Sequence, residues 1–248
     1  MIITDEVADL DTPAGPMRTY VYRPADDGRR PGVVLFSEIF QVTAPIRRTA
    51  AWLAGHGYVV AVPEVFHELE PGPGVVLAYD TEGADRGNAD KIAKELRSYD
   101  DDARAALDFL AAHEACDGAL GVMGICIGGH LAVRAAINPD VRAAACFYAT
   151  DIHKRSLGKG MHDDTLDRLG EIRGELMMIW GRQDPHIPYD GRRVVQDALT
   201  EVDARFTWHE FNGQHAFMRD EGARHDPELA RICHGLVLAL FHRRLCGT

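Results

Sequence analysis

Residues 119–138 read ALGVMGICIGGHLAVRAAIN, and this stretch decides the fold. Its apolar first part ends in Gly124-Ile125-Cys126-Ile127-Gly128-Gly129, and a segment rich in small residues follows at once. This is the nucleophile-elbow pattern G-x-C-x-G-G, with cysteine where serine is usual. It predicts a sharp turn between a strand and a helix, with the Cys126 side chain above the end of the sheet. The alternative is a small buried cysteine in a glycine-rich turn, since free cysteine packs well in cores.

The residue types around Cys126 have a chemical reason. A nucleophile on a sharp turn has a strained backbone, so glycines two residues to either side are needed to avoid side-chain clashes. The next amide, that of Ile127, lies at the N-terminus of the predicted helix. It is therefore directed at the place where an oxyanion would develop, and it can stabilise that charge.

Strands and helices alternate on both sides of this stretch. Short runs rich in β-branched and apolar residues predict strands, and apolar residues at three- and four-residue steps predict helices. The other predicted strands are 18–23 (an early edge strand), 32–36, 58–62, 141–148, 175–180 and 205–211. Four other helices are predicted. The first is capped by Thr43, and the third covers 191–199. The second is long, and its buried face is expected to contain Ile92, Leu96, Tyr99, Ala103, Ala106 and Leu110; the fourth is capped by Asp226, and its buried face is expected to contain Leu229, Ile232, Leu236 and Leu240.

This alternation predicts an α/β fold. We expect a mostly parallel central sheet with helices on both faces, in a single domain over residues 1–248. Residues 64–88 carry no clear period and contain Pro71-Gly72-Pro73-Gly74, so a long loop is expected there. The polar segment 151–173 is expected to cap the edge of the site.

Composition limits the classes of function. No apolar run approaches the roughly 20 residues that a membrane span needs, and the acidic start lacks the order of a signal peptide. Five cysteines without C-x-x-C spacing fit reduced thiols, so a cytoplasmic protein is expected. The formal charge of −11 argues against nucleic acid. An anionic substrate would therefore have to meet local arginines.

Three predicted strand ends carry chemistry, in the chain order Cys126, Asp184, His215. Catalytic groups in open α/β sheets gather at the carboxyl ends of strands, and this order is that of α/β-hydrolases. His215 can take the thiol proton, while Asp184 can orient the imidazole and stabilise its charged form. Cysteine attacks as the thiolate, which a histidine partner and a helix N-terminus both favour.

Other histidines are weaker candidates. His130 lies one helical turn after Cys126, and His186 lies two residues after Asp184. The chain contains no H-E-x-x-H motif, and the run from His162 to Asp164 lacks the spacing of metal ligands. We therefore predict neither a metal site nor a cofactor.

These residues resemble the dienelactone hydrolase (carboxymethylenebutenolidase) family of α/β-hydrolases over nearly the full chain. Ser37-Glu38-Ile39-Phe40 is similar to the family's Glu-Ile-Phe motif. The resemblance implies that Glu38 hydrogen-bonds the resting thiol and swings to deprotonate it when substrate enters. It also implies that the Ile39 amide joins that of Ile127 in the oxyanion hole. From the residues alone, Glu38 is equally well a solvated charge at a strand end.

The family binds its substrate carboxylate with two arginines. Arg219 keeps the family's four-residue step after His215, and Arg86 is the best match to the other arginine. Without the family, either arginine would be read as a surface charge. One departure concerns length: from Cys126 to Asp184 is 184 − 126 = 58 residues, longer than expected, with the extra length in 151–173.

The expected function is hydrolysis of a lactone or other activated ester by Cys126. The family implies dienelactone (4-carboxymethylenebut-2-en-4-olide) as substrate and maleylacetate as product. A broader carboxylesterase, thioesterase or organophosphate-ester hydrolase is the alternative within the enzyme class. The alternative outside it is a non-catalytic ligand-binding hydrolase fold. The expected partner is a small, anionic lactone or ester, and the expected state is a monomer or homodimer.

Overall fold

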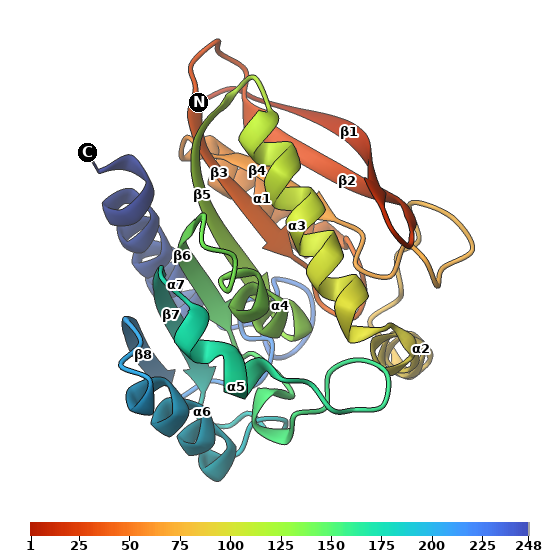
Figure 1. Ribbon diagram of the computed structural model, residues 1–248, viewed down its shortest axis with the longest axis vertical. Coiled ribbons are helices and arrows are strands. Elements are labelled where there is room, and N and C mark those ends of the chain that lie inside the picture. Colours follow the sequence, from red (N-terminus) through yellow and green to blue (C-terminus); the bar gives the residue numbers. More distant parts are fainter. Residues whose placement is uncertain (248) are drawn as a thin grey trace.

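A computed structural model describes residues 1–247, which form one mixed eight-stranded sheet with helices on both faces (Figure 1). The strand order is β1-β2-β4-β3-β5-β6-β7-β8. The first two strands run antiparallel to their neighbours and the others are parallel. The strands are β1 (Ile3–Thr12), β2 (Gly15–Pro24), β3 (Arg30–Phe36), β4 (Val59–Pro63), β5 (Cys116–Ile125), β6 (Val141–Phe147), β7 (Glu175–Gly181) and β8 (Phe206–Phe211).

Helices cover the sheet on two sides. Helices α3 and α4 pack on one face, whereas α1 and α7 pack on the other (Figure 1). The helices are α1 (Ala44–Gly55), α2 (Thr81–Ala93), α3 (Leu96–Ala112), α4 (Ile127–Ala135), α5 (Thr165–Arg168), α6 (Tyr189–Glu201) and α7 (Pro227–Phe241), with the short turns η1 (Ile152–Lys154), η2 (Leu169–Glu171) and η3 (His242–Cys246). None of the helices in residues 1–247 is long and apolar enough to cross a bilayer.

The central strands are buried along their whole length, which explains their apolar runs. Every residue of β4 and β7 is buried, as is all of β3 except Arg30. A strand covered on both faces has no solvent side and so shows no alternation of polar and apolar residues. The predicted α/β architecture is therefore confirmed. Because the parallel strands share a direction, their carboxyl ends meet at one edge of the sheet.

The prediction that 18–23 is an edge strand was wrong. This segment belongs to β2, which lies between β1 and β4. The true edge strand is β1, over Ile3–Thr12, and it was not predicted. Only Leu10 of its residues is buried, so β1 lacks the apolar signal of a core strand. It is rich in acidic residues, which protect an exposed sheet edge against pairing with another chain.

The long helix predicted through Ile92 and Leu110 is two helices. Helix α2 ends at Ala93 and α3 begins at Leu96, because Lys94 and Glu95 have extended backbones. The residues of the predicted face from Tyr99 onward are buried in α3, but Ile92 is 42% exposed. Helix α2 begins at Thr81, so the expected loop 64–88 is shorter than predicted.

The buried face of helix α7 is shifted by about one residue from the predicted one. The buried residues are Ala230, Cys233, Val237, Leu240 and Phe241. Leu229, Ile232 and Leu236 are only half-buried. Asp226 does cap the helix, since its carboxylate accepts a hydrogen bond from the amide of Leu229.

Candidate active site

The turn between β5 and α4 holds Cys126 in a left-handed backbone conformation, with φ 64° and ψ −121°. Three backbone hydrogen bonds fix it. The Cys126 amide donates to the Phe147 carbonyl (3.1 Å), and the Cys126 carbonyl accepts from Gly129 (3.0 Å) and Thr150 (3.3 Å). Such a conformation is costly for a residue with a side chain and persists only where the surroundings enforce it. The sharp strand-to-helix turn predicted from the sequence is thus present.

The glycines around Cys126 are required by close backbone approaches. A Cβ atom on Gly124 would lie 1.7 Å from the carbonyl oxygen of Gly128. A Cβ atom on Gly128 would lie 2.2 Å from the carbonyl oxygen of Phe36, at the end of β3. No side chain fits at either position, so the elbow can form only with glycine there.

The imidazole of His215 is held by Asp184 beside the elbow. Its Nδ1 lies 2.6 Å from Oδ2 of Asp184, and both side chains are buried. The other carboxylate oxygen of Asp184 accepts a hydrogen bond from the amide of His186 (2.8 Å). Asp184 follows β7 and His215 follows β8, so the parallel sheet brings both to the carboxyl edge at which Cys126 sits.

The environment of His215 favours its charged form. Burial lowers the pKa of this imidazole, but the charge of the nearby Cys126 and the hydrogen bond with Asp184 raise it to about 10. A histidine between a thiolate and a carboxylate is stabilised as imidazolium, because each neighbour supplies a negative charge at close range. The arrangement can therefore hold a thiolate–imidazolium pair.

The two weaker histidine candidates occupy other places. His130 is fully buried, and its Nε2 lies 2.7 Å from the hydroxyl oxygen of Thr165. His186 lines the cavity beside His215, with 4.7 Å between the ring centroids. Burial and the nearby charge of His215 lower the pKa of His186, which favours its neutral form.

Glu38 is buried at the end of β3, with 3% of its surface exposed. Its carboxylate accepts a hydrogen bond from the Tyr79 hydroxyl (3.1 Å) and lies 3.9 Å from the Arg219 guanidinium. Burial raises its pKa, although Arg219 and His215 act in the opposite direction. In the part of the chain that the structure describes, no hydrogen bond joins Glu38 to Cys126. The thiol contact implied by the family resemblance is therefore not the arrangement seen here.

Of the two residues whose amides are expected to form an oxyanion hole, Ile39 lines the cavity and Ile127 directly follows Cys126, which also lines it. Within residues 1–247, no backbone hydrogen bond uses the amide of Ile39 or that of Ile127. The Ile127 amide is the first of α4, where helix geometry leaves donors without internal partners. Free amides at this edge are suited to stabilise an oxyanion.

These groups surround a cavity of about 680 Å³. Cys126, His215, Glu38 and Ile39 line it together, and Arg219 lines it as well. The Arg219 guanidinium lies 4.1 Å from the centre of the Tyr79 ring.

Arg86, by contrast, does not line the cavity. Its guanidinium pairs with Glu70, and 47% of its side chain is exposed. The residues of α2 that line the cavity are Ala84, Asn88 and Lys91, and Arg86 points away from that face. Placing Arg86 in the substrate site was therefore wrong.

Several cavity residues were missed by the sequence analysis. Tyr79 lies in the segment expected to be a loop, directly before Asp80, the N-cap residue of α2. Lys91 and Asp151 both line the cavity and form an ion pair at 2.7 Å. The available signal for Asp151 was its place just after the strand β6, where cavity residues of a parallel sheet collect.

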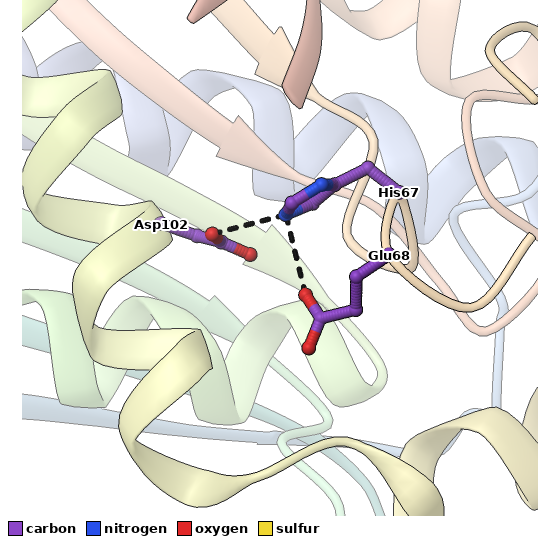
Figure 2. A group of neighbouring side chains, drawn as sticks. All are labelled: His67, Glu68 and Asp102. Carbon is purple, nitrogen blue, oxygen red and sulfur yellow. Dashed lines mark hydrogen bonds and ion pairs between the residues drawn. The ribbon is translucent and has the colours of Figure 1, made fainter. Parts of the chain in front are cut away.

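One cluster outside the cavity has the donor spacing of a metal site. The Nε2 atom of His67 lies 3.1 Å from Asp102 and 3.3 Å from Glu68 (Figure 2). The buried Lys94 ammonium bonds both carboxylates, at 2.7 Å from Asp102, and so supplies the positive charge there. The run from His162 to Asp164 forms no such cluster, because Asp163 accepts from the amides of Leu157 and Thr165 while His162 is exposed.

A mostly parallel eight-stranded sheet with a nucleophile elbow, and with an aspartate and a histidine after its last two strands, β7 and β8, defines an α/β-hydrolase. The model of the dienelactone hydrolase family matches residues 17–244, and the chain belongs to that family of hydrolases.

Relatives agree with this assignment. A Saccharomyces cerevisiae protein provisionally named carboxymethylenebutenolidase is 40% identical, over 99% of this chain and 93% of the relative. The carboxymethylenebutenolidase of Pseudomonas sp. strain P51 is 26% identical, over 87% and 86%. A provisionally named dienelactone hydrolase of Klebsiella pneumoniae has a similar crystal structure, with a TM-score of 0.86, 24% identity, and coverage of 98% and 100%.

Proposed function

We propose that this protein hydrolyses a lactone or activated ester through Cys126, His215 and Asp184, with dienelactone as substrate and maleylacetate as product. The observation that carries the proposal is the imidazole of His215, which Asp184 holds at 2.6 Å in a cavity that Cys126 and Arg219 also line. The names of the relatives support the choice of substrate.

The proposed reaction has two stages. In the first, the Cys126 sulfur attacks the lactone carbonyl, and the amides of Ile39 and Ile127 hold the oxyanion. Collapse of this intermediate breaks the acyl–oxygen bond, opens the ring and leaves a thioester on Cys126. The released enolate takes a proton from the His215 imidazolium and becomes the ketone of the product, which leaves His215 neutral.

In the second stage, His215 removes a proton from water as the water attacks the thioester. The carbon–sulfur bond breaks and the thiolate is regenerated beside the imidazolium. Asp184 keeps Nδ1 of His215 bonded, so that Nε2 is the nitrogen that exchanges protons. Acyl transfer to cysteine needs the thiolate, and the His215 charge favours it.

Glu38 and Arg219 complete the site. Glu38 is a buried carboxylate whose raised pKa suits a group that accepts and releases a proton. We assign it the removal of the thiol proton when it turns from Tyr79 towards the sulfur. Arg219 binds the substrate carboxylate, since a guanidinium matches a carboxylate in charge and shape.

The test is a hydrolysis panel of dienelactone isomers and neutral aryl esters, with wild type and Arg219→Ala. The expected result is a loss of about tenfold or more in kcat/KM on the lactones, with the neutral esters nearly unchanged, because a charge-assisted contact is removed. Equal losses on both substrate classes would contradict the role of Arg219. A wild type inactive on every ester would overturn the proposed function.

A broader esterase is the second candidate. The cavity of about 680 Å³ is large for one small lactone, and Arg86 does not contribute a second arginine. Turnover of neutral aryl esters at rates above those of dienelactone would favour this candidate. A cytoplasmic location is proposed for either function, because all five cysteines are free and four of them are buried.

A further inference from the structure

The outer part of the active-site cavity carries two cations that the proposed reaction does not use. Lys154 lies in the turn η1 after β6, and Arg224 lies in the loop between β8 and α7. Both are exposed, so they stand at the mouth of the cavity, whereas the buried Cys126 lies inside it.

The other charged groups of the cavity have partners. Lys91 pairs with Asp151 at 2.7 Å, and Arg219 faces Glu38 at 3.9 Å. Asp80 caps α2 through the amide of Gly83, and Glu221 pairs with Arg48 outside the cavity. Positive and negative charges therefore largely cancel on the inner walls.

Lys154 and Arg224 differ from these groups. Within residues 1–247 neither forms an ion pair or a side-chain hydrogen bond. The contrast is clearest for lysine: of the chain's four lysines, Lys91, Lys94 and Lys159 all pair with carboxylates, and only Lys154 does not. Both cations are therefore available to an anion at the mouth of the cavity.

Arg224 acts on the interior of the site as well. After burial and His215, its charge is among the causes that lower the pKa of His186, so the guanidinium lies within electrostatic reach of that ring. His186 in turn packs against His215. Arg224, His186 and His215 all line the same cavity.

We propose that Lys154 and Arg224 form a second anion subsite, so that the site also accepts lactones or esters that carry a second acidic group, which dienelactone lacks. One group binds Arg219 near the nucleophile, and the other binds at the mouth. The proposal rests on the proposed function and extends it to a substrate class, dianionic lactones or esters. The spare length of the 151–173 segment supplies Lys154 and so contributes directly to specificity. Carboxylate and phosphoryl groups share the chemistry that these cations recognise.

The test uses the protection of Cys126 against alkylation by iodoacetamide, which requires no turnover. Dissociation constants are measured for diacids from succinate to suberate, for monoacids of equal length, and for 3-phosphonopropionate. The best diacid is expected to bind up to about fivefold more tightly than its monoacid, since an exposed charge pair contributes at most a factor of about this size. The advantage should shrink as ionic strength rises. Its dependence on chain length reports the spacing of the two subsites.

Two variants and a matched control locate the effect. Lys154→Gln and Arg224→Gln should each weaken diacid binding by about two- to fivefold and leave monoacid binding unchanged. Lys159→Gln removes a charge from the same segment but outside the cavity, and it should change neither diacid binding nor monoacid binding. A diacid advantage that survives in both variants, or no advantage in wild type, would overturn the proposal.

Two further arms separate the remaining possibilities. If 3-phosphonopropionate protects better than succinate and loses this advantage in the same variants, the subsite is supported and its group is phosphoryl. If succinate protects better, the group is a carboxylate. An enzyme that hydrolyses no ester but shows the diacid effect would contradict the proposed function while supporting the subsite.

Discussion

At the scale of single residues, burial and charge oppose each other in the site. Glu38 is buried with a single hydrogen-bond donor, Tyr79, and an arginine at 3.9 Å. A buried carboxylate in such surroundings is destabilised relative to its neutral form, which is why its pKa is raised. The site keeps this unfavourable charge, and we attribute its retention to proton transfer.

The change Glu38→Gln is expected to stabilise the fold and to impair catalysis. The pKa of Glu38 is raised in the folded protein above its unfolded value near 4.5. Its contribution to the free energy of unfolding is therefore fully present below pH 4.5, where the carboxyl is protonated, and is lost as pH rises through the folded-state pKa. The melting temperature of the variant should therefore be about 2–4 °C higher than that of wild type at pH 7.5, which corresponds to about 1 kcal/mol in the free energy of unfolding. The difference should vanish near pH 4. The value of kcat should fall by about 100-fold or more.

Thermal unfolding followed by circular dichroism at pH 4 and pH 7.5 measures the stability, and initial rates measure kcat. A variant that is less stable than wild type at pH 7.5 would contradict the account of Glu38. Unchanged kcat would remove Glu38 from the chemistry.

At the scale of elements, helix α2 explains why part of the site could not be predicted. Its only buried residues are Gly83 and Gly87, so it has no apolar stripe from which its orientation could be read. A Cβ on Gly87 would lie 2.3 Å from the Ile39 carbonyl oxygen, so the helix packs directly on the oxyanion loop. Because α2 has no apolar face, the sequence could not show which of its sides is turned to the cavity, and so could not show that Lys91 lines the cavity and Arg86 does not.

Gly87→Ala tests this contact. The methyl group must displace either α2 or the loop, and so move the Ile39 amide. We expect kcat to fall by about 10- to 100-fold, because a small displacement of an oxyanion donor is costly. Gly235→Ala is the matched control, since Gly235 also lies in a helix and has open space around its Cα. That control should keep full activity and gain up to about 1 kcal/mol of stability. Full activity of Gly87→Ala would contradict the packing argument.

The junction between α2 and α3 depends on Lys94. Its ammonium is fully buried between Glu68 and Asp102, and these carboxylates also face His67 (Figure 2). Lys94→Met leaves both carboxylates without their cation and should lower the free energy of unfolding by about 3–5 kcal/mol. Urea unfolding of wild type and variant measures this change in the free energy of unfolding. The exposed pair of Lys159 and Glu95 is the control, and Lys159→Met should have no measurable effect. A similarly small effect of Lys94→Met would mean that the cluster does not hold the junction.

At the scale of the whole molecule, the convergence of distant residues follows from topology. The alternation of apolar strands and helices predicted a parallel sheet, and such a sheet brings the residues after β5, β7 and β8 to one edge. That reasoning was sufficient to bring together Cys126, Asp184 and His215. It could not find β1, whose exposed and acidic sequence lacks a core pattern, nor the position of Tyr79, which depends on contacts made by a segment without a period.

The central claim is that Cys126 becomes acylated during turnover. The most direct measurement is mass spectrometry of the enzyme quenched in acid while it hydrolyses an ester, with peptide mapping and the Cys126→Ala variant alongside. The account predicts an acyl mass on the peptide containing Cys126, its disappearance as substrate is exhausted, and no turnover in a folded Cys126→Ala protein. Undiminished hydrolysis by that folded variant, with no adduct on the wild type, would contradict it.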